Sequence, residues 1–267
     1  MNEGKRVLPR KILTACGVLL LMVSMSWAQD QSTKQDQTTK HDQAATEDET
    51  STQNQSDIAK RIDASARVLD EIMATPDKGI PNKVMSDAKC IAVVPSMIKI
   101  AVGFGGSHGK GVATCRTAHG WSAPAPITIT GGSWGLQLGG EAVDLVMVVM
   151  NQQGMQALLS SKFKIGANAT ASAGPVGRYA GADTNWKMKS EILTYSRSRG
   201  VFAGIDLNGA AVTQDKDETR VLYGKYEPFS VILAGKVRAK NASDPFLAAV
   251  RKYSSQSGDT HTNGPGY

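Results

Sequence analysis

The first clear hydrophobic pattern along the chain is helical and covers residues 57–74. Apolar residues such as Ile58, Ile62 and Leu69 fall on one face at helical spacing. The other face carries charges of both signs: Lys60, Arg61, Arg67, Asp63, Asp70 and Glu71. A strongly cationic face would be typical of a helix lying on a membrane surface. The mixed face therefore favours packing of the apolar stripe on a sheet.

Beyond residue 89 the hydrophobic period changes from that of a helix to that of strands. A short helix is predicted at 82–88, and the β-branched runs that follow are separated by Gly and Pro at 90–94, 98–104, 111–116, 127–130, 135–138 and 143–149. Further strands are expected at 163–173, 193–195, 201–206 and 210–213, with helices at 152–161 and 244–253. These patterns predict an α+β fold, a single Gly-rich, mostly antiparallel β domain with an N-terminal amphipathic helix and a few short helices.

The N-terminal residues 1–28 have the layout of a secretory signal peptide. A cationic start precedes an apolar run at 12–25, and Ser26, Trp27 and Ala28 form a small-x-small cleavage site. We expect cleavage after Ala28 and a periplasmic or secreted protein. Residues 13–16 also match a lipobox, but most of the apolar run follows Cys16 instead of preceding it. This order argues against a lipoprotein anchored through Cys16.

Charge separates the next segment from the rest of the chain. Residues 29–56 are rich in Gln, Thr and Asp and lack large apolar side chains, so we expect a disordered tether. The leader contributes +3 and the tether −4 to the formal net charge of +6, which leaves +7 on residues 57–267. We place the folded domain at 57–240 and a short helix with a disordered tail at 241–267. A basic domain favours anionic partners, and the scattered charge without a binding motif argues against nucleic acid.

Cysteine and histidine usage suggests no metal site. The exported chain would keep Cys90 and Cys115, and two interpretations stay open: a disulfide, or two small buried side chains on neighbouring strands. His108 and His119 are eleven residues apart and no HExxH or paired CxxC accompanies them. We therefore predict neither a metal nor a cofactor.

Two glycine-rich motifs resemble catalytic loops only in part. Residues 131–135 match GxSxG around Ser133, but no helix is predicted after them, and the only later histidine is His261 in the expected tail. Residues 102–111 match neither GxGxxG nor a Walker A loop. Lys110 in this segment can meet a lipid phosphate as a point charge. We expect no enzyme.

Several sequence motifs, which follow one another in a fixed order along the chain, resemble those of a known family. They are PDKGIPNKVMSDAKCIAVVP (76–95), SHGKGVATCR (107–116), GWSAPAPITI (120–129), GGSWGLQLGGE (131–141), GPVGR (174–178) and YSRSRGVFAGIDLNG (195–209). Together with Tyr223 and Gly224, they resemble the SYLF domain, the lipid-binding module of the Ysc84 and SH3YL1 proteins. The resemblance covers residues 57 to 226 and implies a bacterial, secreted member of this family. It also implies that residues 102–111 form a β-turn that joins two strands.

The resemblance implies a non-enzymatic module that binds phosphoinositide or another anionic phospholipid and acts at membranes of the bacterial cell envelope. Eukaryotic members bind through an N-terminal amphipathic helix and basic residues, and some also bind actin. The corresponding candidates here are Lys60, Arg61, Arg67, Lys78, Lys83, Lys110 and Arg178. The alternative is a structural or protein-interaction module of the periplasm that has no lipid ligand and contacts an envelope protein.

Overall fold

The computed structural model describes residues 35–75, 79–102, 104–134, 139–177, 190–198, 201–202 and 207–255. The chain divides into two units, Met1–Thr46 and Glu47–Tyr267, and the second contains all the strands that the structure describes. The helices are α1 (Gln35–Met73), α2 (Asn82–Asp87), α3 (Gln152–Leu159), α5 (Lys216–Tyr223), α6 (Phe229–Ile232) and α7 (Asp244–Ser254), with the 3-10 helix η2 (Asn241–Ser243). The predicted signal peptide and the predicted strand at 135–138 lie outside the described residues.

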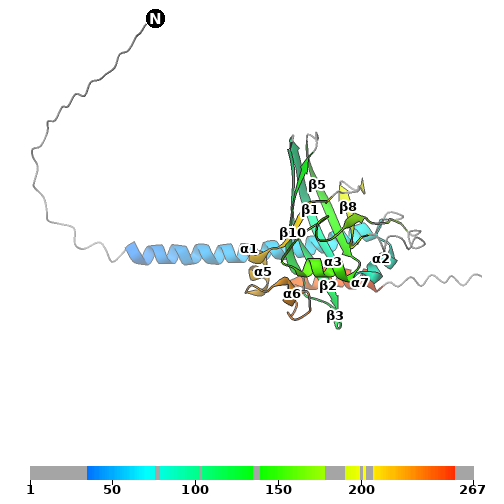
Figure 1. Ribbon diagram of the computed structural model, residues 1–267. Coiled ribbons are helices and arrows are strands. Elements are labelled where there is room, and N and C mark those ends of the chain that lie inside the picture. Colours follow the sequence, from blue (N-terminus) through cyan, green and yellow to red (C-terminus); the bar gives the residue numbers. More distant parts are fainter. Residues whose placement is uncertain are drawn as a thin grey trace, which may run out of the picture. The chain divides into compact units, whose positions relative to one another are not determined.

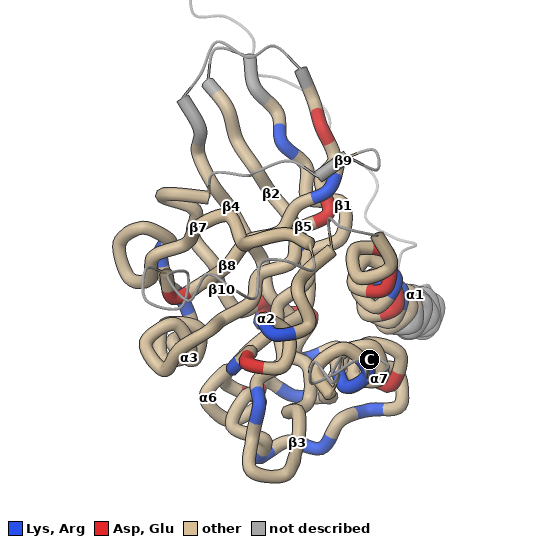
Figure 2. The backbone as a smooth tube through the Cα atoms, turned by 90° about the vertical axis from the view of Figure 1, so that its right-hand side faces the viewer, with Lys and Arg blue, Asp and Glu red and all other residues tan. Residues whose placement is uncertain are grey.

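The sheet is mostly antiparallel, which confirms the predicted fold class. Its strands are β1 (Cys90–Val102), β2 (Phe104–Thr117), β3 (Gly120–Trp121), β4 (Ala125–Trp134), β5 (Gly139–Val149), β6 (Lys162–Lys164), β7 (Ala171–Ala173), β8 (Ile192–Ser198), β9 (Val201–Phe202) and β10 (Ala211–Gln214). Their order is β6-β10-β4-β2-β1-β5-β8-β7, with β3 beside β2 and β9 beside β8, and among these described strands only β7 and β8 pair in parallel. The long strands β1, β2, β4 and β5 project beyond the helices (Figures 1 and 2).

Helix α1 is longer than the sequence pattern indicates. Its last turns coincide with the predicted amphipathic helix, but it begins at Gln35, inside the segment expected to be disordered. Residues 29–75 contain neither Gly nor Pro, so no residue interrupts a helix that extends from the packed turns toward the N-terminus. The apolar face is buried as predicted, since Ile58, Ile62 and Leu69 are at most 2% exposed.

The segment interpreted as a turn at 102–111 is mostly strand, because β2 begins at Phe104. The register between β1 and β2 shifts after Val93, where β1 passes through an irregularity that includes Ser96 at a φ of 51°. Close approach of the two strands explains the glycines: a Cβ on Gly111 would lie 2.0 Å from the Val93 carbonyl oxygen. Glycine in a strand often marks such a bend.

One hydrophobic cluster joins α1, the base of the sheet and the C-terminal helices. Phe229 on α6 and Phe246 on α7 are completely buried in it. Helix α7 was predicted at 244–253, and the indole of Trp121 donates a hydrogen bond to Ser254 at its end, at 3.0 Å. The packed core thus includes helix α7, which lies beyond residue 240.

Candidate functional site

Three of the predicted lipid-binding cations form ion pairs within their own helices. Lys60 lies 3.6 Å from Asp57, Lys83 lies 3.3 Å from Asp87, and Arg67 contacts Asp63. All three cations are largely exposed, so each pair contributes little to stability. The pairs nevertheless reduce the charge that these residues present to an anionic surface. Lys78 and Arg178 lie outside the described residues.

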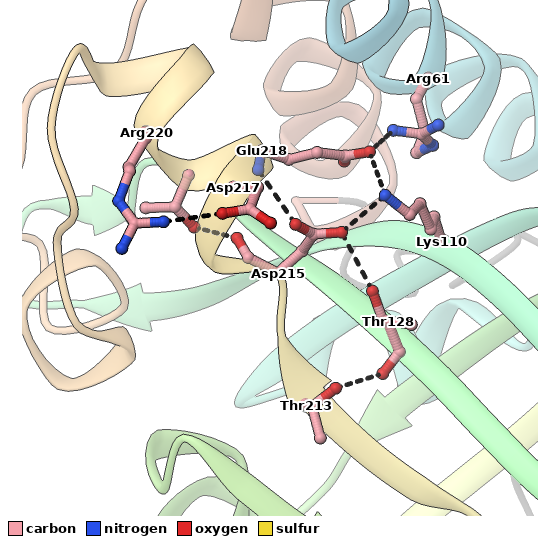
Figure 3. A network of polar contacts seen from close by, with 9 residues as sticks. Arg61, Lys110, Thr128, Thr213, Asp215, Asp217, Glu218 and Arg220 are labelled. Carbon is pink, nitrogen blue, oxygen red and sulfur yellow. Dashed lines mark hydrogen bonds and ion pairs between the residues drawn. The ribbon is translucent and has the colours of Figure 1, made fainter. Parts of the chain in front are cut away.

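The other two predicted cations, Arg61 and Lys110, meet in one polar network (Figure 3). Arg61 on α1 contacts Glu218 on α5, which is 157 residues away in sequence. The Lys110 ammonium on β2 lies 2.9 Å from Asp215 and 3.0 Å from the same Glu218 oxygen. The hydroxyl of Thr128 on β4 donates to Asp215 at 3.1 Å. The network therefore links two helices to two central strands.

Helix α5, which the sequence patterns did not reveal, positions the acidic half of this network. Asp215 is its N-cap and accepts a hydrogen bond from the Glu218 amide at 3.0 Å. Gly224 ends the helix at a φ of 77°, a conformation that favours glycine. The sequence signal was available, because an aspartate precedes a polar run that ends at glycine. The cap places both carboxylates beside Lys110.

The pKa values of Asp215 and Lys110 are both shifted in the direction that favours the charged form of each group. Burial would raise the pKa of Asp215, but hydrogen bonds from the Glu218 amide, Lys110 and Thr128 outweigh it and lower this pKa. Burial likewise disfavours charged Lys110, yet the two carboxylates raise the pKa of its ammonium group. Two cations thus face two carboxylates, and the network is close to neutral as a whole. Its main effect is to hold α1 on the sheet.

A second charged junction fixes the far end of α1. Arg197 on β8 contacts Glu71 on α1 and lies 3.2 Å from Asp144 on β5. The neighbouring residue Asp70 accepts a hydrogen bond from the Tyr253 hydroxyl of α7 at 2.6 Å. With its apolar face buried and both ends ion-paired, the packed part of α1 is a structural helix whose hydrophobic side is covered.

Free positive charge lies instead on the segment between α6 and α7. Lys236, Arg238 and Lys240 are exposed and alternate with Val237 and Ala239, which pack against the core. Among the residues that the structure describes, none of these three cations has an acidic partner. Many Lys and Arg positions lie around α6, α7 and β3 (Figure 2). We call Lys236, Arg238 and Lys240 the basic segment.

A separate apolar surface lies on the projecting part of β1. Ile98 and Ile100 are 52% and 56% exposed, and alternation along the strand places them on the same face. Their partners across β2 and β5 are mostly small: Gly106 and Gly140 beside Ile100, His108 and Ala142 beside Ile98. The two isoleucines therefore project from a surface of mostly small side chains.

Cys90 and Cys115 are disulfide-bonded. They are directly opposite each other in the pairing of β1 and β2, and both are completely buried. The bond closes a loop between residues 25 apart in sequence. It ties together the two strands that carry the exposed isoleucines and Lys110.

The backbone around Ser133 does not have the geometry that the GxSxG motif requires in a hydrolase. The backbone at Ser133 belongs to β4 and pairs with Gly105 of β2, so it does not form the strand-to-helix turn of a nucleophile elbow. Within the described ranges, no three His, Cys, Asp or Glu side chains gather closely enough to hold a metal ion. In the same part of the chain, no helix has an apolar stretch that would allow it to cross a bilayer.

Comparison with known proteins relates the chain to binding and regulatory proteins. Residues 130–253 match the family described as Ysc84, Las17-binding protein actin regulator. Protein YSC84 of Saccharomyces cerevisiae is 33% identical over 175 residues, which are 64% of this chain and 37% of the yeast protein. LAS seventeen-binding protein 3 of the same species is 32% identical over 175 residues, covering 64% of this chain and 38% of that protein.

A vertebrate relative shows the same partial coverage. SH3 domain-containing YSC84-like protein 1 of Xenopus laevis is 35% identical over 152 residues, 56% of this chain and 45% of the frog protein. The match thus spans less than half the length of each of these three relatives. None of their names describes an enzyme. The residues that match the family model run from the end of β4 through α7, and in this part the chain carries a Ysc84 (SYLF) domain.

Proposed function

We propose that this chain is a non-catalytic module that binds anionic phospholipid, of the phosphoinositide-binding type, at a membrane surface. The basic segment is the observation that carries the proposal. Lys236, Arg238 and Lys240 keep their full charge because no carboxylate neutralises them among the described residues. Each cation near an anionic surface contributes about 1 kcal/mol, so the three together favour binding by roughly a hundredfold.

We further propose that the protein acts in a bacterial cell envelope. The support is the signal-like sequence of residues 1–28, and the buried disulfide suits an oxidising compartment. Export would bring the basic segment to the anionic lipid surfaces that face the periplasm. Detection of a mature N-terminus at Gln29 in a periplasmic fraction would test this part, and a protein retained in the cytoplasm with an intact leader would contradict it.

Co-sedimentation with lipid vesicles tests the lipid-binding proposal. The chain from Gln29 onward should sediment with vesicles that mix phosphatidylcholine and phosphatidylglycerol, and binding should weaken as salt increases. It should not sediment with pure phosphatidylcholine. Absence of binding to both, or equal binding to both, would refute the proposal.

Two matched variants test which positive charges bind the anionic vesicles. One replaces the basic segment (K236Q, R238Q and K240Q), and the control replaces three ion-paired cations (K60Q, R67Q and K83Q). Both remove three positive charges. We expect the first variant to bind anionic vesicles roughly a hundredfold more weakly and the second to lose much less. Equal losses would show that only total charge matters.

The second candidate is a protein-interaction module without a lipid ligand. The yeast relative LAS seventeen-binding protein 3 is named for binding a protein, and exposed Ile98 and Ile100 favour a protein contact. Binding through these side chains would persist at high salt and would be lost in an I98S/I100S variant. An envelope protein captured under high salt by the original chain, but not by this variant, would favour the second candidate.

A further inference from the structure

A partly open cavity of about 540 Å³ lies beside the basic segment. One wall is the α1 turn that contains Gln55 and Ile58, and the second is the C-terminal turn of α5. The third wall is formed by Lys240, the N-cap of η2, and by Ala242 within η2. The volume falls within the range of small-molecule pockets, roughly 300–1,000 Å³. All three walls belong to the unit Glu47–Tyr267.

The lining is divided between apolar and polar groups. Ile58 and Leu222 are buried side chains that face the cavity from α1 and α5. Gln55 and Ser56 supply neutral hydrogen-bonding groups, and Lys240 is the one charged residue among those that line the cavity. A cavity with apolar walls and a single cation suits a ligand that has an apolar chain and an anionic head.

The charges around the cavity orient such a ligand. Lys240 has no acidic partner among the described residues, so it is available to an anion. Lys60 and Asp57 on the neighbouring turn of α1 pair with each other at 3.6 Å. The C-terminal turn of α5 carries partial negative charge, which disfavours an anion on that side. The head would therefore lie at Lys240, with the chain against Ile58 and Leu222.

We infer that this cavity binds a single-chain anionic lipid, with its phosphate at Lys240 and its acyl chain against Ile58 and Leu222. The inference rests on the proposed lipid-binding function, and it adds an internal site to the surface contact. The cavity admits one chain beside its head more readily than two. Surface attraction by Lys236 and Arg238 would raise the local concentration of anionic lipid near the opening.

Calorimetric titration of the chain from Gln29 onward tests the site with three probes. The first is oleoyl lysophosphatidic acid, kept below the concentration at which it aggregates, and the others are glycerol 3-phosphate and monooleoylglycerol. We expect saturable binding of one lysophosphatidic acid per chain. Glycerol 3-phosphate and monooleoylglycerol should each bind at least about tenfold more weakly. The first lacks the acyl chain that contacts the apolar wall, and the second lacks the phosphate that pairs with Lys240. Equal binding of glycerol 3-phosphate would identify a phosphate site and refute the lipid inference.

A blocking variant shows whether the ligand occupies the cavity. Ala242 lines the cavity and is exposed, so A242W should close it without disturbing the core. Ala248 is an exposed alanine on α7 that does not line it, and A248W is the matched control. We expect A242W to lose lysophosphatidic acid binding by at least about tenfold and A248W to keep it. K240Q should also weaken binding by about tenfold.

The outcomes separate this inference from the proposed function. A242W leaves the three cations of the basic segment in place, so its sedimentation with anionic vesicles should be unchanged. If A242W binds lysophosphatidic acid as tightly as the original chain, or if that chain shows no saturable binding, the cavity inference is wrong while vesicle binding can still stand. If vesicle binding fails but A242W abolishes lysolipid binding, the surface contact is wrong and the internal site remains.

Discussion

Replacement of Asp215 is the sharpest test of the network that holds α1 on the sheet. The D215A change removes an N-cap from α5, the acceptor of the Thr128 hydroxyl and one of the two carboxylates beside Lys110. The Asp215 side chain is only 9% exposed, so water does not readily replace these contacts. The substitution therefore removes contacts of α5, β2 and β4 at the same time.

The cost follows from three contributions. Loss of the cap costs about 1 kcal/mol. The Thr128 hydroxyl, left without its acceptor, costs about another 1 kcal/mol. Lys110 is 38% exposed and keeps Glu218, so its lost partner contributes about 1 kcal/mol at most after screening. We therefore expect D215A to lower the free energy of unfolding by about 3 kcal/mol near neutral pH. D215N keeps the cap and should lose about half as much.

Acidification should reduce the difference in the free energy of unfolding between the original chain and D215A. The pKa of Asp215 is lowered in the folded state, so its stabilising effect is present above the pKa of the unfolded chain. That effect is lost as the pH falls through the folded-state pKa, below the ordinary value of 3.8. Urea unfolding followed by far-ultraviolet circular dichroism, over a pH series starting near neutrality, measures the difference. A difference below about 0.5 kcal/mol near neutral pH, or one that grows on acidification, would refute the reasoning.

Three further predictions concern the core. F246A removes a completely buried ring from α7 and should cost about 3–5 kcal/mol by urea unfolding, whereas a loss below 1 kcal/mol would mean that α7 does not belong to the core. Replacing Cys90 and Cys115 together by alanine should cost about 3.5 kcal/mol for a loop of 25 residues, and reduction should then have no further effect on the melting temperature. G111A forces a Cβ to within 2.0 Å of a backbone oxygen and should destabilise by at least about 2 kcal/mol, whereas G106A, with its nearest neighbour at 3.9 Å, should be close to neutral by the same assay.

Local sequence patterns predicted many of the helices and strands and the family resemblance. The spacing of Ile58, Ile62 and Leu69 predicted a helix with one buried face, because that face recurs with the helical period. The β-branched runs separated by glycine predicted a mostly antiparallel sheet, and the sequence motifs in these runs resemble those of the SYLF domain. Patterns failed where long-range packing outweighs local preference. Residues 105–111 are strand because β1 bends over them, and no local signal reports that contact.

The structure decided which cations are free, and for Arg61 and Lys110 only the tertiary packing brings the carboxylate partners close. Lys60, Arg61, Arg67, Lys83 and Lys110 look like available charges in the sequence, yet every one of them has a carboxylate partner. The alternation at 236–240 was visible, but its significance depends on what lies near it. Whether a cation can attract a ligand depends on the distance to its nearest carboxylate, and folding sets that distance between residues as far apart as 157 positions.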